Sequence, residues 1–174
     1  MLRILLATLV LALPLMRSAV ALTSDDLQSL LDERTLVRIA DGIDDAVDAK
    51  DWARARAFFA DRVAVDFSSL GAGPPKTIPA DDLIGGWAAN LKGSKTSLHL
   101  RTNHLVRVTG DRAVMTSHGY AWNRLEGNGD PLWEVWGLYE HRFTRTGAGW
   151  TVDGFTFRVM HERGNMWVKA TPGS

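Results

Sequence analysis

The chain has 174 residues, 45% of them apolar, and its twenty Lys and Arg are balanced by twenty Asp and Glu. This length and composition suit one domain with its own core. The positive residues form no basic stripe of the kind that binding to nucleic acids or anionic membranes requires. The absence of cysteine excludes disulfides, thiol catalysis and cysteine-based metal sites.

The first residues are typical of a signal peptide. A short positive region, Met1 to Arg3, precedes an apolar run from Ile4 to Met16, and Ala19-Val20-Ala21 supplies the small residues that signal peptidase accepts. The run is shorter than the roughly 20 residues that a membrane-spanning helix needs. We therefore expect cleavage after residue 21 and an exported domain, 22–174, in the periplasm or outside the cell, without membrane contact. The alternative is an uncleaved membrane anchor.

A long helix is predicted to begin at Thr23, which forms a capping pair with Asp26. An apolar stripe at helical spacing continues it and consists of Leu36, Ala40, Ile43 and Val47. We expect Asp41, Asp44 and Asp45 to face away from this stripe.

Two more helices are predicted before the sheet begins. Asp51 caps a short one, and a brief strand from Val63 to Phe67 follows it. The Gly- and Pro-rich segment 71–75 breaks that strand into a loop. Pro79 then suits the first turn of a third helix, which ends near Lys92.

Four long strands are predicted in the second half of the chain, joined by short Gly-containing turns. They are Ser97–Thr109, Ala113–Leu125, Leu132–Thr144 and Trp150–Met160. Short turns connect antiparallel neighbours, so the chain reads as helices followed by an antiparallel meander. This order is an α+β pattern in which the helices cover one face of the sheet.

The third long strand has two different faces. One set of alternate residues, from Trp133 to Phe143, suits a core or a pocket wall. The other set places Trp136 and Leu138 among charged residues, which is typical of a face partly covered by another subunit. We therefore expect a homodimer.

Four segments carry motifs of a known family. They are Ala46 to Trp52 (AVDAKDW), His99 to His104 (HLRTNH), Leu138 to Glu140 (LYE) and Gly149 to Val152 (GWTV). In this order and spacing they resemble the SnoaL-like branch of the nuclear transport factor 2-like superfamily, over roughly Leu31 to Val168. The resemblance implies a cone-shaped α+β barrel, a highly curved sheet around a long helix, with a pocket at the open end.

The resemblance also implies a catalytic pair, Asp48 and His99. In related dehydratases, an aspartate at this corner orients a histidine that acts as general acid or base. Imidazole suits this task because its ordinary pKa is about 6.5, and a carboxylate partner fixes its tautomer. The alternatives are that Asp48 only stabilises the corner before Asp51 and that His99 only lines the sheet.

Asn103 and His104 are the next polar candidates. An extended chain directs them to opposite faces, so only one shares the face of His99 unless a bulge intervenes. The adjacent apolar residues Leu105 and Val106 make a bulge plausible. We assign Asn103 to the pocket and a structural role to His104.

Four aromatic residues, Trp87, Trp122, Trp133 and Tyr139, are candidates for the pocket wall, with core packing as the alternative for each. Together they favour a small hydrophobic or aromatic ligand, and no Gly-rich phosphate loop is present. The spacing of Asp48 and the histidines matches no recognised metal-ligand motif. We expect a site without metal or cofactor.

The chain departs from the catalytic relatives at two positions. The resemblance implies a tyrosine where this chain has Ile43, and an acid or histidine near Trp122. The groups that polarise a carbonyl and assist a leaving hydroxyl are therefore missing, unless Tyr139 or Arg158 replaces them. Three functions stay open: a dehydratase or isomerase that uses His99, a binding protein without catalysis, and a dimeric interaction module.

Overall fold

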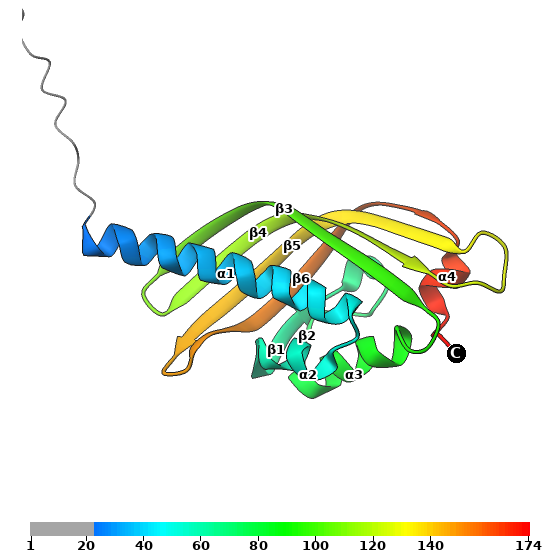
Figure 1. Ribbon diagram of the computed structural model, residues 1–174, viewed down its shortest axis with the longest axis horizontal. Coiled ribbons are helices and arrows are strands. Elements are labelled where there is room, and N and C mark those ends of the chain that lie inside the picture. Colours follow the sequence, from blue (N-terminus) through cyan, green and yellow to red (C-terminus); the bar gives the residue numbers. More distant parts are fainter. Residues whose placement is uncertain (1–22) are drawn as a thin grey trace, which may run out of the picture.

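The computed structural model describes residues 23–174, which form one six-stranded sheet curled around a long helix (Figure 1). The helices are α1 (Ser24–Asp48), α2 (Trp52–Ala57), the 3-10 turn η1 (Ser68–Leu70), α3 (Ala80–Asn90) and α4 (Met166–Ala170). The strands are β1 (Phe59–Asp66), β2 (Lys76–Pro79), β3 (Thr96–Thr109), β4 (Arg112–Arg124), β5 (Leu132–Thr146) and β6 (Gly149–Gly164). The expected signal peptide, 1–21, lies outside the described residues.

The strand order β2-β1-β6-β5-β4-β3 confirms the antiparallel meander of the four long strands. β1 returns parallel to β6 and pairs antiparallel with β2. The predicted α+β class and the three N-terminal helices are confirmed. Three short elements are additional: the 3-10 turn η1, the strand β2, which follows the Gly-Pro loop too closely to show a strand pattern, and the five-residue helix α4.

Local sequence signals explain where α1 begins and ends. The Thr23 hydroxyl accepts a hydrogen bond from the Asp26 N–H at 3.1 Å, and the Asp26 carboxylate accepts one from the Thr23 N–H at 2.9 Å. This reciprocal pair satisfies two of the free N–H groups at the helix start. At the other end, Lys50 adopts a left-handed backbone, with a φ of 57°, and Asp51 caps α2.

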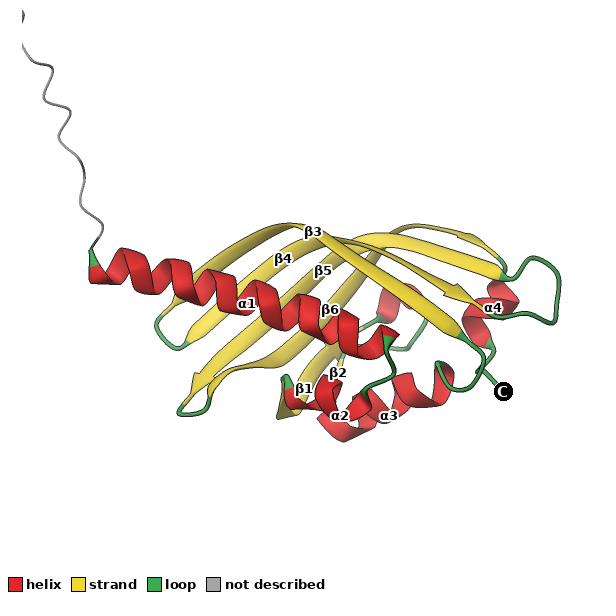
Figure 2. Cartoon of the chain, viewed as in Figure 1, coloured by secondary structure: helices red, strands yellow, loops and turns green. Residues whose placement is uncertain are grey.

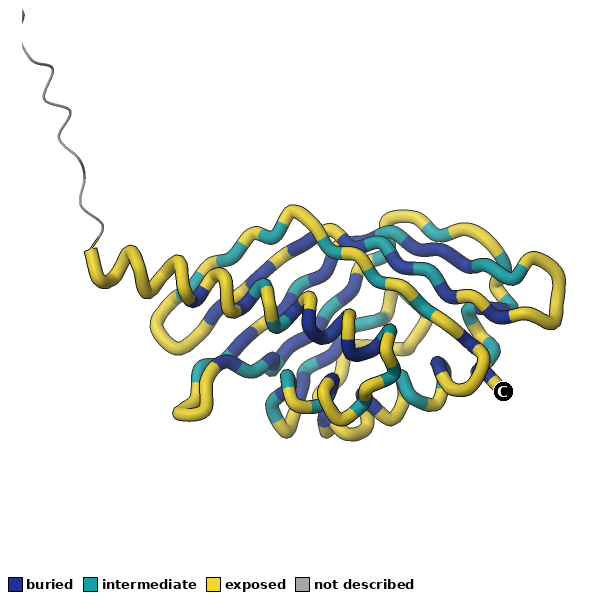
Figure 3. The backbone as a smooth tube through the Cα atoms, viewed as in Figure 1, coloured by how far each residue is buried: buried dark blue, intermediate teal, exposed yellow. Residues whose placement is uncertain are grey.

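The long helix crosses β4, β5 and β6 on the inner face of the sheet at a steep angle, whereas the first half of β3 runs alongside it (Figure 2). Its first turns extend beyond the sheet and are exposed, whereas its second half is buried (Figure 3). The buried carboxylate of Asp32 marks the change, because it accepts hydrogen bonds from Arg145 at 3.0 Å and from the Trp150 indole at 3.1 Å. These contacts attach α1 to β5 and β6.

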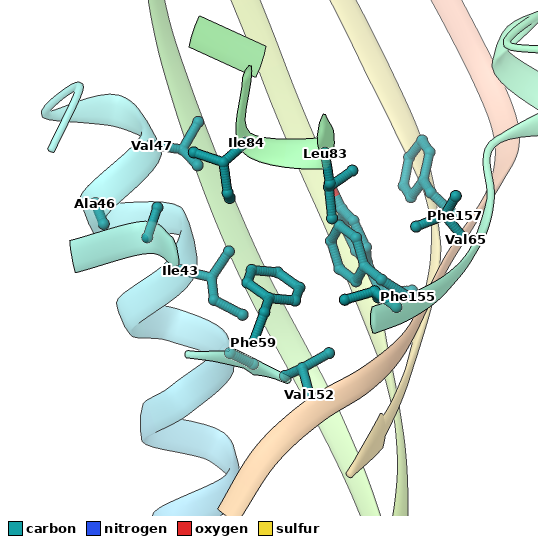
Figure 4. Packing of buried hydrophobic residues seen from close by; sticks show 14 of the residues in the cluster. Ile43, Ala46, Val47, Phe59, Val65, Leu83, Ile84, Val152, Phe155 and Phe157 are labelled. Atoms are coloured by element: carbon teal, nitrogen blue, oxygen red, sulfur yellow. The ribbon is translucent and has the colours of Figure 1, made fainter. Parts of the chain in front are cut away.

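The core lies between α1, α3 and the inner face of the sheet. Ile43 of α1 faces Phe59 of β1, and Phe155 of β6 stands behind them (Figure 4). The rings of Phe59 and Phe155 are 6.0 Å apart, and the Phe155 ring is 5.8 Å from that of Trp87, in edge-to-face arrangements. On β5, the predicted inner set from Trp133 to Phe143 is buried throughout, as expected.

The C-terminal segment, residues 165–174, packs against α3 and the start of β3. The buried ammonium of Lys95 donates to the Asn90 side-chain oxygen at 2.7 Å and to the Thr171 carbonyl at 2.9 Å. The Gly173 N–H donates to the Asn90 carbonyl at 3.0 Å. This packing closes one end of the space beneath the sheet. Within residues 23–174, no helix combines the length and apolarity needed to cross a bilayer.

Candidate functional site

A cavity of about 360 Å³ lies between the second half of α1, α3 and the inner face of the sheet. Its walls are mainly aliphatic and aromatic: Ile43, Val47, Phe67, Leu70, Trp87, Leu91, Trp133, Val135, Tyr139, Phe155 and Phe157. The polar residues of its lining are Asp44, Asn90, His99, Arg101, Asn123 and Lys169. An apolar cavity of this size with a few convergent polar groups is typical of a small-molecule site.

Asp48, the last residue of α1, holds His99 of β3 by two contacts. One carboxylate oxygen lies 2.7 Å from His99 Nδ1, and the other accepts the His99 backbone N–H at 2.7 Å. The Ser97 hydroxyl donates a third bond to the same carboxylate at 2.7 Å. The two residues that the sequence predicts as a pair are therefore in direct contact.

The contact determines the tautomer of His99. Burial alone would raise the pKa of Asp48, but the hydrogen bonds from His99 and Ser97 and the charge of His99 lower it below its usual value. An ionised carboxylate only accepts hydrogen bonds, so His99 Nδ1 carries the proton. In the neutral imidazole, the lone pair then lies on the other ring nitrogen, Nε2. This is the arrangement required of a general base.

Two further acids of α1 face β3 beside this pair. Arg101 makes a bidentate ion pair with Asp44, with Nη2 at 2.6 Å from one oxygen and Nε bound to the other. His104 Nε2 lies 3.4 Å from Asp41 Oδ1. Three acid–base pairs thus follow one another between helix and strand, and we call them the α1–β3 ladder: Asp48–His99, Asp44–Arg101 and Asp41–His104.

The expectation that Asp44 faces away is wrong. Asp44 lies one helical turn from both Ala40 and Asp48, on the buried side of α1, and its side chain is 9% exposed. The sequence stripe was drawn from apolar residues only. It therefore missed a buried charge whose partner lies on a distant strand.

The assignment of Asn103 to the pocket is also wrong. A bulge interrupts the pairing of β3 with β4 between Thr102 and Leu105, and Asn103 adopts a left-handed backbone with a φ of 55°. The extra residue exchanges the two faces. Asn103 is exposed and donates to His118 Nδ1 at 2.8 Å, whereas His104 faces α1.

Of the predicted aromatic residues, Trp87, Trp133 and Tyr139 line the cavity, and Trp122 does not. Trp122 lies in β4 between Ala121 and Asn123, which both face the cavity. Alternation along the strand therefore places Trp122 on the outer face. The small side chain of Ala121 lies opposite His99, which leaves space in front of the imidazole.

Arg101 is a cavity residue that the sequence reading passed over. Its side chain is 1% exposed, its Cζ lies 3.8 Å from the centre of the Tyr139 ring, and its Nη1 donates to His141 Nε2 at 3.1 Å. Burial, with the charge of Arg101, lowers the pKa of His141 well below its usual value, so this imidazole is neutral. Arg158, named with Tyr139 as a possible replacement, is exposed. Within residues 23–174, no three potential metal ligands come together.

Comparison with known proteins agrees with this architecture. The crystal structure of the Kfla4162 protein from Kribbella flavida is 24% identical, covers 82% of this chain and 99% of that one, and has a TM-score of 0.74. A Novosphingobium aromaticivorans protein, provisionally described as a scytalone dehydratase, is 16% identical over 79% of this chain and 89% of its own, with a TM-score of 0.66. The type 3 hexachlorocyclohexane dehydrochlorinase LinA of Novosphingobium barchaimii is also 16% identical. The match covers 79% of this chain and 92% of that one, with a TM-score of 0.65.

No curated protein matches the chain. The model of the SnoaL-like domain family matches residues 28–156, which include most of α1, the Asp48–His99 pair and most of the sheet. The curled sheet, the long helix and the cavity between them are the features that the sequence resemblance implies. The chain therefore belongs to the SnoaL-like domain family and has the nuclear transport factor 2-like fold.

Proposed function

We propose that this protein is a cofactor-independent dehydratase or isomerase that acts on a small hydrophobic molecule. The observation that carries the proposal is the Asp48–His99 pair, because it leaves His99 Nε2 basic at the wall of an apolar cavity. The similarity to proteins described as a dehydratase and a dehydrochlorinase supports elimination chemistry.

The chemistry needs only proton transfer. His99 Nε2 takes a proton from a substrate carbon while Asp48 stabilises the resulting imidazolium. In a dehydratase, the electron pair of the C–H bond forms a C=C bond as the neighbouring C–O bond breaks. His99 then returns its proton to the departing hydroxide, and water leaves. In an isomerase, the proton returns to a different carbon.

The test is an NMR assay of the purified protein with apolar β-hydroxy ketones and β,γ-unsaturated ketones. We expect His99→Ala to abolish turnover and Asp48→Asn to reduce it by about 10²- to 10⁴-fold, because the amide favours the wrong tautomer. His118→Ala is the matched control, since this histidine is exposed on the outer face. Turnover that survives in His99→Ala would exclude the mechanism.

A binding protein without catalysis is the second candidate, favoured by the apolar side chain of Ile43 in the cavity wall. A ligand at about 100 times its dissociation constant adds roughly 2.7 kcal/mol to stability, which a thermal-shift screen of steroids, polyketides, terpenoids and aromatic acids detects. Hits that persist in His99→Ala and Asp48→Asn, without turnover in the wild type, would favour this candidate.

We also propose that the protein is a homodimer through the outer face of the sheet. Leu100, Tyr120 and Trp136 stand in register across β3, β4 and β5, and the rings of Tyr120 and Trp136 are 4.9 Å apart. Leu100 is 54% exposed, as expected of a residue that a second copy covers. Sedimentation at micromolar concentration should give a dimer that Trp136→Glu dissociates. A monomeric wild type would exclude the proposal.

Export from the cytoplasm is a separate proposal. We propose cleavage after Ala21, with Leu22 as the new N-terminus. Intact mass and N-terminal sequencing of the protein recovered outside the cytoplasm test this, and a full-length chain retained in the cell membrane would support the anchor instead.

A further inference from the structure

Arg101 lies beside His99 in the cavity wall. Both residues come from β3 and face inward, two positions apart, which places them about 6.6 Å from each other along the strand. Gly119 lies opposite Arg101 on β4 and leaves room for the Tyr139 ring that covers the guanidinium, and Ala121 lies opposite His99. A molecule that presents an acidic C–H to His99 Nε2 therefore has its neighbouring atoms close to the guanidinium.

The guanidinium keeps hydrogen-bonding capacity for a ligand. Of its five N–H groups, those on Nε and Nη2 bind the two oxygens of Asp44, and one on Nη1 binds His141. His141 is neutral and accepts this bond, so it does not compete for charge. Two N–H groups remain that no described residue engages. Because the side chain is 1% exposed, bulk water does not reach them, and the cavity is the space from which a partner can come.

The residues around Arg101 hold its guanidinium in one position, and Asp44 compensates its positive charge. The Tyr139 ring covers its face at 3.8 Å, and the bidentate contact with Asp44 fixes its plane. Because Asp44 neutralises the pair as a whole, binding of a negatively charged oxygen depends on direct hydrogen bonds from Arg101 and not on net charge. Preorganised donors of this kind stabilise an oxygen on which charge develops during reaction.

We propose that Arg101 binds the carbonyl oxygen of the substrate and stabilises the enolate formed when His99 removes the adjacent proton. This inference rests on the proposed function and names its substrate class: small apolar ketones, aldehydes or esters with a C–H group next to the carbonyl. Arg101 supplies the electrophilic half of the site that Ile43 and Trp122 do not.

The step balances without a cofactor. The C–H proton moves to His99 Nε2, the C–H electron pair becomes the C=C bond of the enolate, and the carbonyl π pair moves to oxygen. That oxygen accepts hydrogen bonds from the two free N–H groups of Arg101. Collapse of the enolate re-forms the C=O bond and either expels a β-hydroxyl group, which takes the proton from His99, or returns the proton to carbon.

The test uses 4-nitrophenol, whose phenolate mimics an enolate and is coloured, and 4-nitroanisole, its neutral analogue. We expect the wild-type protein to bind the phenolate more tightly than the anisole, with a shifted phenolate absorbance. Loss of the two N–H groups should weaken phenolate binding by about 10- to 100-fold and leave anisole binding unchanged.

The variant that removes these groups must not leave a buried carboxylate unpaired. We therefore pair Arg101→Met with Asp44→Asn, which removes both charges together, and use Arg101→Lys as the conservative variant that keeps part of the preference. A wild type that binds both probes equally, or a double variant that keeps the phenolate preference, would overturn the inference.

His99→Ala separates this inference from the proposed function. It should bind the phenolate as the wild type does, although it catalyses nothing. If the wild type shows no phenolate preference but has His99-dependent turnover, the role of Arg101 is refuted and the proposed function stands. If the preference is present and depends on Arg101 but no panel compound turns over, the oxygen site stands and the proposed function fails.

Discussion

Asn103 and His104 are consecutive residues of β3, yet the left-handed backbone of Asn103 sends its amide to His118 on the outer face and turns His104 towards Asp41. This bulge aligns the third rung of the α1–β3 ladder. From Asp48 to Asp44 to Asp41 the acids of α1 are spaced four and then three residues apart. Their partners on β3 are spaced two and then three residues apart. A regular strand would have placed Leu105, not His104, on the inner face.

The backbone of Asn103 provides the first prediction. Glycine tolerates a positive φ, so Asn103→Gly should change the free energy of unfolding by only a few tenths of a kcal/mol. A β-branched residue is strained there, and Asn103→Val should cost about 1–2 kcal/mol. Urea unfolding measures both. Equal stability of the two variants would mean that the left-handed conformation is not required.

Gly119 provides the second prediction. A Cβ atom at this position would overlap the Tyr139 ring, which covers Arg101. We expect Gly119→Ala to destabilise the protein by about 1–3 kcal/mol and to weaken ligand binding, because Tyr139 must move into the cavity. Gly85→Ala is the control: nothing lies within 4 Å of its added Cβ, and alanine in a helix should stabilise by up to about 1 kcal/mol. Thermal unfolding compares the pair.

Asp32 provides the third prediction. Arg145 and the Trp150 indole donate to this buried carboxylate, and the Arg145 hydrogen bonds lower its pKa. Asp32→Ala should cost about 2–3 kcal/mol, less than for a fully buried pair because Arg145 is partly exposed. Asp61→Ala, whose carboxylate is exposed beside Arg56, should cost under about 1 kcal/mol.

The pH dependence of the same residue has a defined sign. A lowered folded pKa means that the unfolded chain binds the proton more readily, so the contribution of Asp32 is complete above its ordinary pKa of about 3.9 and is lost as the pH falls through the folded value. The stability difference between wild type and Asp32→Ala should therefore shrink in acid. A constant difference would contradict the ion pair.

Lys95 provides the fourth prediction. Burial lowers the pKa of its ammonium from 10.5 to about 8. Between these values the unfolded chain holds more protons than the folded one, so the free energy of unfolding should rise with pH across this window, by about 1–3 kcal/mol. Lys95→Met should lack this rise when unfolding is measured by urea at several pH values. The same rise in both proteins would assign it to other groups.

The sequence predicts most of the fold because its signals are local and periodic. Thr23 and Asp26 mark the start of α1, alternation marks the buried face of β5, and glycine-rich turns mark the meander. The family resemblance predicts the Asp48–His99 pair, and in the structure the two side chains are in contact.

The rest of the site depends on contacts between distant residues. Asp44 looks like a solvated acid until Arg101, 57 residues later, is known to face it. The aromatic character of Trp122 does not reveal the phase of its own strand, in which the neighbouring Asn123 takes the inner place. The side of a bulge on which a residue falls cannot be read from alternation, because the bulge itself breaks the alternation.

The bulge has another consequence, for association with other chains. β3 is an edge of the sheet and is 14 residues long, with Leu98, Leu100 and Leu105 exposed along it. A long regular edge with such side chains is a template on which further strands add and aggregates grow. The single extra residue at Asn103 divides this edge into two short, twisted stretches. Removing it should therefore misalign the ladder and also make the protein prone to fibrous aggregation.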